Sequence, residues 1–456
     1  MALTRLEILK RAPYQDGAEF GEVGPYERID AVAHYAVDPT TEANGGIVDL
    51  ALAARGPDGL VSFEGDVTIL RPVDPSRGQR AALVEVPNRG RRTAVSMFNR
   101  AATVIEPTAA IDAGDGFLFH HGWTVVWAGW QWDVPRSPAR MGLTAPVVVD
   151  AAGQAVADEV QLRLQLHQRV RSVDLTDHHV GLLGGHQPLA VVDVDDPEAR
   201  LLRRDGLWGE PEEVPRREWR FARDESGSPV PDPSHVWLDG GFEPGRIYDL
   251  VYRSSPCPVA GTGLLALRDL ASFLRSAGPS NPSAGELDHL VVTGQSQCGR
   301  FLRTFLHLGL NQGEDELPAY DGVLAHIAGG RRGEFNQRLG QPSVQPTPGF
   351  GHRFPFADEA QSDPGTGLSG GLLDRQRQLG CMPKVFYTNT SSEYWRGDAS
   401  LSHSSVVDGS DVDPPSDTRH YLFASTQHGP GMLPLMDESV FGSHGGNCFN
   451  IVDYTP

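Results

Sequence analysis

The stretch Gly294-Gln295-Ser296-Gln297-Cys298-Gly299 lies between a predicted buried strand and a predicted helix. The four residues before it, 290–293, are apolar or β-branched, which is typical of a core strand. Beyond it, apolar residues recur at helical spacing as far as Gly309, which can end a helix. A serine on such a sharp turn from strand to helix projects its hydroxyl from the carboxyl end of a sheet. We therefore predict that Ser296 is a catalytic nucleophile.

A second serine competes for this role. The stretch Gly367-Leu368-Ser369-Gly370-Gly371 matches the pattern G-x-S-x-G literally, whereas Cys298 takes the place of the second glycine after Ser296. Residues 363–366, which precede Ser369, indicate a turn rather than a strand. Too few residues then follow to fit the helices and strands that should precede the other catalytic groups. We expect Ser369 to lie in a flexible loop.

Two loops after later strands can supply the partners that a serine nucleophile needs. A serine hydroxyl needs a histidine to take its proton, and that histidine needs a carboxylate to fix its tautomer. Glu393 follows a predicted strand at 385–388, and His428 follows a predicted strand at 421–424. In α/β-hydrolases the three groups occur in the order serine, acid, histidine. Ser296, Glu393 and His428 are therefore the predicted triad.

Other residues compete for the acid and the base. Asp398 lies only five residues beyond Glu393 and could supply the carboxylate. His403 and His444 are alternative bases, although neither directly follows a predicted strand. His326 lies inside a predicted strand, which is more typical of a hydrogen-bonded core histidine.

An oxyanion hole requires two backbone N–H groups directed at one oxygen atom. The residue after the nucleophile, Gln297, is expected to supply the first. The second is expected from the loop Asn88, Arg89 and Gly90, which follows a predicted strand at 81–86. This loop also fits an ordinary turn, so the second donor is the weaker prediction.

Several residues are candidates for contacts with a substrate, because they lie near the nucleophile or in glycine- and proline-rich loops. They are Trp130, Trp132, Arg300, Phe354 and Phe356. Arg300 lies one helical turn beyond Ser296 and could equally form a structural salt bridge. The phenylalanines could equally form a small hydrophobic cluster under a long loop.

Strands that alternate with helices predict an α/β fold, with a mostly parallel central sheet flanked by helices. We expect one domain, 1–456, in which residues 1–75 are rich in β-structure. Residues 131–258 are predicted to be an insertion, because apolar and polar residues alternate strictly over 160–166, as in a half-exposed antiparallel strand. Residues 333–380 are predicted to form a lid or cap.

The composition excludes several classes of function. A net charge of −20 argues against nucleic acid and anionic membranes as partners. Four widely spaced cysteines and the lack of an apolar leader or membrane span indicate a cytoplasmic protein. No cofactor or metal is expected, because His120-His121 and Asp177-His178-His179 lack the spacing of known metal motifs. The oligomeric state is left open.

In combination, these motifs resemble bacterial serine esterase-like proteins with an α/β-hydrolase domain. The stretches that carry the resemblance are 85–91, 258–263, 294–300, 325–333, 389–395 and 426–429. The resemblance implies an α/β-hydrolase fold and the Ser296–Glu393–His428 triad, but no particular substrate. Cys298 departs from the small residue usual at its position and could crowd the turn. Similar proteins also continue beyond the position of Pro456 into a final helix, so we expect either a different cover for that surface or a truncated chain.

Hydrolysis of a carboxylic ester through an acyl-enzyme is the leading hypothesis for the function. The substrate is expected to be a small-molecule ester, with a bulky or aromatic one as the first guess. Acyl transfer, lactone opening and amide cleavage need the same groups and stay open. Metal-dependent hydrolysis and a non-catalytic binding protein on a hydrolase scaffold are the alternatives from other classes.

Overall fold

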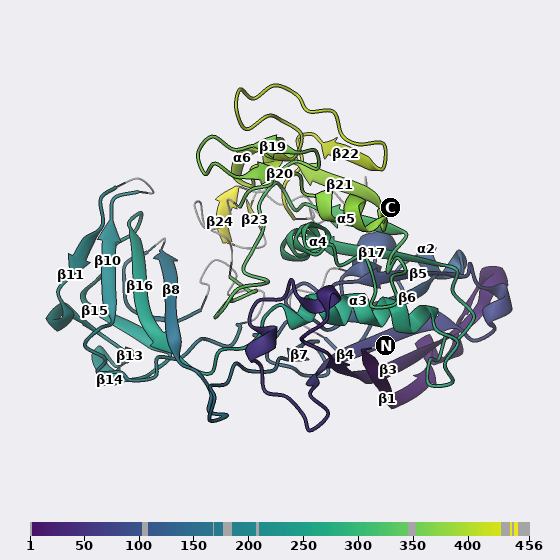
Figure 1. Ribbon diagram of the computed structural model, residues 1–456, viewed down its shortest axis with the longest axis horizontal. Helices are drawn as coiled ribbons and strands as arrows, with labels where there is room; N and C mark the ends of the chain where they lie inside the picture. Colours follow the sequence, from purple (N-terminus) through teal and green to yellow (C-terminus); the bar gives the residue numbers. More distant parts are fainter. Residues whose placement is uncertain are drawn as a thin grey trace.

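The computed structural model describes most of the chain. The described residues are 2–102, 108–166, 168–176, 185–206, 209–344 and 353–429, together with the backbone of 438–439 and 442–445. They form a large sheet with helices on its faces and a smaller lobe built of strands, on the left in Figure 1. The expectation about the end of the chain, beyond 445, lies outside the described residues.

The central sheet has eleven strands and is mixed rather than mostly parallel. Its main path runs β1 (Leu3–Pro13), β3 (Gly24–Val37), β4 (Val61–Pro72), β6 (Thr124–Ala128), β5 (Ala81–Glu85), β17 (His289–Gln295), β18 (Gly322–His326), β21 (Lys384–Thr390) and β22 (Thr418–Phe423). Two short strands pair beside it, β2 (Glu19–Phe20) with β3 and β7 (Leu143–Thr144) with β4. The strands from β6 to β22 are parallel, and those from β1 to β6 pair antiparallel. The prediction of a mostly parallel sheet is therefore wrong for the N-terminal strands, which extend the sheet in antiparallel fashion.

Helices cover both faces of this sheet. They are α1 (Ala94–Phe98), α2 (Phe117–His120), α3 (Thr262–Arg275), α4 (Gln297–His307), α5 (Asp374–Leu379) and α6 (Ser391–Arg396). Neighbouring residues of β5 belong to two separate buried clusters, because successive side chains of a strand point to opposite faces. Leu83 belongs to the cluster that contains residues of α1 and α2, and Val84 to the one that contains residues of α3 and α4.

The smaller lobe lies between β7 and α3 in the sequence. One sheet contains β8 (Asp158–Gln165), β10 (Arg200–Arg204), β11 (Glu212–Val214) and β16 (Ile247–Ser254), and the other contains β9 (Val170–Asp174), β12 (Trp219–Arg220) and β15 (His235–Phe242). A hairpin of β13 (Ala222–Glu225) and β14 (Ser228–Pro231) accompanies them. The predicted alternation is confirmed in β8, which pairs antiparallel with β16 and buries Leu162 and Leu164. The division into an insertion at 131–258 and a lid at 333–380 stays a prediction.

The remaining strands are short. They are β19 (Gln361–Ser362), β20 (Ser369–Gly370), β23 (Glu438–Ser439) and β24 (Gly442–Gly445). Throughout the described part of the chain, no helix is both long enough and apolar enough to cross a lipid bilayer.

Candidate active site

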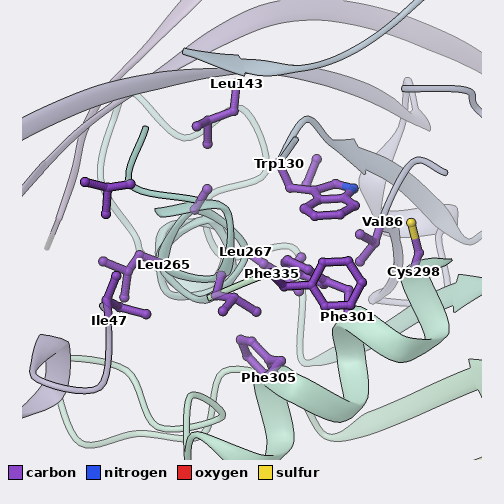
Figure 2. Packing of buried hydrophobic residues seen from close by; sticks show 14 of the residues in the cluster. Ile47, Val86, Trp130, Leu143, Leu265, Leu267, Cys298, Phe301, Phe305 and Phe335 are labelled. Carbon is purple, nitrogen blue, oxygen red and sulfur yellow. The ribbon is translucent and has the colours of Figure 1, made fainter. Parts of the chain in front are cut away.

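Ser296 occupies the turn between the end of β17 and the start of α4, as the sequence predicts. Its backbone has φ 57° and ψ −114°, a conformation that residues other than glycine rarely adopt. The turn brings backbones so close that a Cβ on Gly294 would lie 2.7 Å from the carbonyl carbon of Cys298. A Cβ on Gly299 would lie 2.9 Å from the carbonyl oxygen of His326. Cys298 itself fits, because its side chain points into the core (Figure 2).

The structure brings the three predicted triad residues together. Ser296 Oγ lies 2.8 Å from Nε2 of His428, and Nδ1 of His428 lies 2.5 Å from Oε1 of Glu393. Glu393 is buried, whereas the His428 ring is half-buried. The residues come from three different segments, and all three lie where a parallel strand of the sheet ends.

The Glu393 carboxylate is fixed by the start of its own helix. Its Oε2 accepts hydrogen bonds from the backbone N–H of Thr390 at 2.7 Å and from the hydroxyl of Thr390 at 2.5 Å. Thr390 Oγ1 in turn accepts from the N–H of Ser392, which completes the capping box of α6. Oε1 therefore remains for His428. Sequence reasoning missed Thr390, although the pattern Thr-x-x-Glu is a readable signal of this motif.

Two opposing effects set the pKa of Glu393. Burial raises it, but the hydrogen bonds from His428 and Thr390 outweigh burial and lower the pKa to about 2. Glu393 is therefore an anion at neutral pH and can only be the acceptor in its hydrogen bond with His428. Nδ1 of His428 carries that proton, which leaves Nε2 to accept from the Ser296 hydroxyl.

The competing residues make other contacts. Asp398 pairs with Arg331 at 2.6 Å, and His403 Nε2 lies 2.8 Å from the hydroxyl of Tyr394. His326 is buried, with Nδ1 2.8 Å from Thr388 Oγ1, and its carbonyl oxygen accepts the N–H of Ser296. The side chain of His444 lies outside the described residues.

Ser369 lies in a short hairpin rather than in the loop that we expected. It belongs to β20, which pairs with β19, and its side chain is exposed. Its hydroxyl lies 2.7 Å from that of Ser362. The turn predicted at 363–366 is confirmed, and it joins the two short strands of this hairpin.

The predicted oxyanion donors are only partly available. Gln297 begins α4, so its backbone N–H lies at a helix N-terminus, where no intrahelical carbonyl can accept it. In the loop of the second donor, Arg89 N–H donates to Oε1 of Gln297 at 3.2 Å, and Gly90 N–H donates to the carbonyl of Pro87 at 3.3 Å. The Asn88 side chain donates to the carbonyl of Gln295 at 3.0 Å. The loop thus touches both neighbours of Ser296, but two of its predicted donors already have protein acceptors.

The predicted substrate contacts fall into two groups. Trp130 is a core residue, because it is buried, packs 4.2 Å from Phe301 between ring centroids and donates to Pro87 (Figure 2). Trp132 donates its indole N–H to the carbonyl of Gly340 at 3.0 Å and so anchors the 340–343 segment. Both tryptophans thus have partners within the protein, and a contact of either one with a substrate stays a prediction.

The other candidates lie along α4 and in the 353–356 segment. Arg300 is buried, and its backbone N–H donates to the carbonyl of Ser296 at 3.0 Å. Phe354 and Phe356 contact each other edge to face, with ring centroids 6.2 Å apart. Phe356 is buried and Phe354 half-buried, which matches a small hydrophobic cluster under a long loop. Residues 345–352 of that loop lie outside the described residues.

Of the histidine pairs considered as metal ligands, only His120-His121 lies within the described residues. His120 and His121 pack against the rings of Phe20 and Phe117. Asp177-His178-His179 lies outside the described residues. Among the described residues, no group of three or more histidine, cysteine, aspartate or glutamate side chains is placed to hold a metal ion.

Comparison with known proteins supports the class of protein that this geometry indicates. A family model described as an alpha/beta hydrolase domain matches residues 240–442, which include Ser296, Glu393 and His428. The match confirms, over residues 240–442, the resemblance to α/β-hydrolases that the motifs indicate.

Two solved structures, both of a glucuronoyl esterase from Solibacter usitatus, are similar to the chain at 8% identity. The match to the first covers 98% of this chain and 83% of the esterase chain, with a TM-score of 0.32. The match to the second covers 92% of this chain and 80% of the esterase chain, with a TM-score of 0.30. At these values the likeness carries no information about a substrate. No curated protein matches the chain.

Proposed function

We propose that this protein is a serine esterase, which cleaves a carboxylic ester through an acyl-enzyme intermediate. The observation that carries the proposal is the hydrogen-bond chain Ser296–His428–Glu393, with distances of 2.8 and 2.5 Å. A nucleophile, a base and an orienting carboxylate in contact are what acyl transfer by a serine requires. The hydrolase domain at 240–442 supports the same class of reaction.

In the first half of the reaction, Ser296 Oγ attacks the ester carbonyl carbon while Nε2 of His428 takes the hydroxyl proton. Glu393 stabilises the imidazolium that forms, and its fixed position keeps Nδ1 protonated. The carbonyl oxygen becomes an oxyanion next to the backbone N–H of Gln297 at the start of α4, where the helix dipole also favours negative charge. The tetrahedral intermediate then collapses, the carbon–oxygen bond to the alcohol breaks, and His428 gives its proton to the leaving alcohol.

In the second half, water takes the place of the alcohol. His428 accepts a proton from the water, whose oxygen attacks the acyl carbon. The bond to Ser296 breaks, Ser296 Oγ regains a proton from His428, and the carboxylic acid leaves. The same steps would open a lactone or cleave an amide, and an alcohol in place of water would give acyl transfer.

The experiment that tests the proposal combines turnover with covalent labelling. The protein should hydrolyse p-nitrophenyl acetate and react with a fluorophosphonate probe, and both activities should persist in EDTA. The Ser296→Ala variant should lose both. A protein that neither turns over esters nor takes the label would favour a non-catalytic binding role on this scaffold, and activity lost in EDTA would favour metal-dependent hydrolysis. A panel of acyl-chain lengths and aromatic esters would then define the substrate.

A further inference from the structure

We propose that the side chains of the two glutamines flanking Ser296 are positioning residues for the oxyanion hole. Gln295 and Gln297 would hold the loop 86–93, which we call the oxyanion loop, in place against the nucleophile. This inference rests on the proposed function, because the position of that loop matters for catalysis only if Ser296 attacks an ester. It goes beyond that proposal, which uses only the backbone N–H of Gln297.

Gln297 connects the oxyanion loop to a second loop. Its side chain is 0% exposed, and its amide both accepts and donates a hydrogen bond. Oε1 accepts the backbone N–H of Arg89 at 3.2 Å, and Nε2 donates to the carbonyl of Pro342 at 2.6 Å. Only a side chain with both a donor and an acceptor can bridge these two backbone groups. The residue that carries the first oxyanion donor therefore also fixes the loop expected to carry the second. Because Gln297 itself accepts Arg89 N–H and Pro87 accepts Gly90 N–H, the predicted second donor that remains in this loop is the backbone N–H of Asn88.

The far end of this bridge makes further hydrogen bonds. The carbonyl of Ser343, next to Pro342, accepts the guanidinium of Arg89 at 2.7 Å. The N–H of Ser343 donates at 2.9 Å to Asp133, whose carboxylate is buried. Gln297 thus joins Arg89 to a segment that makes further hydrogen bonds to Arg89 and to Asp133.

Gln295 holds the other end of the oxyanion loop. Its Nε2 donates to Thr93 Oγ1 at 3.1 Å, and Thr93 Oγ1 donates in turn to the buried carboxylate of Glu85. Glu85 also accepts the backbone N–H groups of Thr93 and Ala94, at 2.9 and 2.6 Å. The loop therefore begins directly after Glu85 and returns to the same carboxylate at its end, with Gln295 joined to the point of return. Sequence reasoning missed Glu85 and Thr93, because their link to Gln295 joins segments that lie 202 residues apart in the chain.

The expected consequence is kinetic. Donors of an oxyanion hole act only when they lie about 2.7–3.1 Å from the oxygen that forms in the transition state. A displacement of about 1 Å can cost on the order of 100-fold in rate. Since the charge on that oxygen develops only after attack, a misplaced loop should lower kcat and leave KM nearly unchanged.

The test compares isosteric variants with a matched control. Gln297→Met and Gln295→Met remove the polar contacts but keep the length of the side chain. Gln376→Met is the control, because Gln376 is a buried glutamine whose Nε2 donates to the carbonyl of Leu306 near the far end of α4. For each variant, kcat and KM for p-nitrophenyl acetate are measured, together with the Ki of a trifluoromethyl ketone, which forms an oxyanion with an active serine.

We expect Gln297→Met to lower kcat by about 10- to 100-fold, and to weaken binding of the trifluoromethyl ketone by a similar factor. Gln295→Met should have a smaller effect of the same kind, and Gln376→Met should stay within about twofold of the wild type. Gln297→Glu should retain more activity than Gln297→Met, because a protonated carboxyl in this buried position can make both bonds. Thr93→Val tests the Gln295 side if a glutamine variant does not fold, and it should also lower kcat.

Several outcomes would overturn the inference. They are wild-type kcat in both flanking variants, a loss confined to KM, unchanged binding of the trifluoromethyl ketone, equal activity of Gln297→Glu and Gln297→Met, or a loss in Gln376→Met as large as in Gln297→Met. Failure of the proposed function looks different, because the wild type itself would then neither hydrolyse esters nor take the fluorophosphonate label.

Discussion

The chain contains two serines in similar glycine-rich stretches, but the elements around them and the contacts of their hydroxyls differ. Ser296 lies between a buried strand and an eleven-residue helix, and its hydroxyl meets an imidazole. Ser369 lies in an exposed two-strand hairpin, and its hydroxyl meets that of another serine, Ser362. The literal G-x-S-x-G match belongs to Ser369. The comparison teaches that the strand and helix on either side of a serine, and not the glycines alone, place it where it can react.

Alanine at each serine is the most direct way to break this comparison. Ser296→Ala should lower kcat for p-nitrophenyl acetate on the order of 10⁶-fold, because no other group can take over the attack. Ser369→Ala should leave turnover unchanged. Both are read from steady-state hydrolysis with equal amounts of folded protein, and loss of activity in Ser369→Ala alone would reverse our assignment.

Amides at the two competing carboxylates sharpen the comparison further. Glu393→Gln should lower kcat by about 10³- to 10⁴-fold, because an amide that donates to Nδ1 leaves the wrong tautomer of His428. Asp398→Asn should change kcat little, because Asp398 pairs with Arg331 instead. Single-turnover acylation measures the effect on the chemical step. A larger loss in Asp398→Asn than in Glu393→Gln would show that the acid was misassigned.

Gly294 and Gly367 each lie two residues before one of these serines. Alanine at each position distinguishes the cost of a close backbone contact from the cost of a positive φ. Gly294→Ala should destabilise the fold by about 1–3 kcal/mol and reduce activity, because its Cβ would meet the backbone of Cys298 and displace the elbow. Gly367 has φ +72° but open space around it, so Gly367→Ala should cost about 1 kcal/mol without loss of activity. Urea unfolding and ester turnover distinguish the two, and full activity in a folded Gly294→Ala variant would contradict the argument.

The last prediction concerns stability alone and involves His326, whose carbonyl accepts the N–H of Ser296. Burial lowers the pKa of His326 to about 4, from its usual 6.5. Between these values the unfolded chain binds a proton that the folded chain does not, so this residue makes stability rise with pH. Burial of Glu85, which raises its pKa to about 7, acts in the opposite direction between pH 4.5 and 7. Because the two effects oppose each other in the wild type, the contribution of His326 to stability is measured as the difference between the wild type and a variant that lacks this histidine.

The free energy of unfolding of the wild type and of His326→Gln should be compared at pH 4.5 and 6.5. The wild type should gain roughly 2 kcal/mol relative to the variant over this interval. An identical pH dependence in both proteins would mean that His326 is not kept neutral by burial.

Local patterns predicted the elements around the site well. The expected strands at 290–293, 385–388 and 421–424 correspond to β17, β21 and β22, and the helical spacing after Ser296 corresponds to α4. Patterns of this kind depend on neighbours along the chain, which the sequence shows directly. The antiparallel half of the sheet, the core position of Trp130 and the hydrogen bond from Arg89 to Gln297 were not predicted. Each of these depends on how distant segments align.

The sequence by itself determined that a serine lies on a tight turn between a strand and a helix. An apolar, β-branched run before Ser296 favours the strand, and Gly294 and Gly299 allow the close approach of backbones in the turn. The sequence also determined the order in which a carboxylate and an imidazole follow later strands. Only the tertiary structure decided which of the competing side chains meet. In the parallel register, Gln295 pairs with His326 and Thr390 with Phe423. These pairings bring the ends of the strands to one edge of the sheet, where Glu393 and His428 meet Ser296, while Asp398 and His403 pair elsewhere.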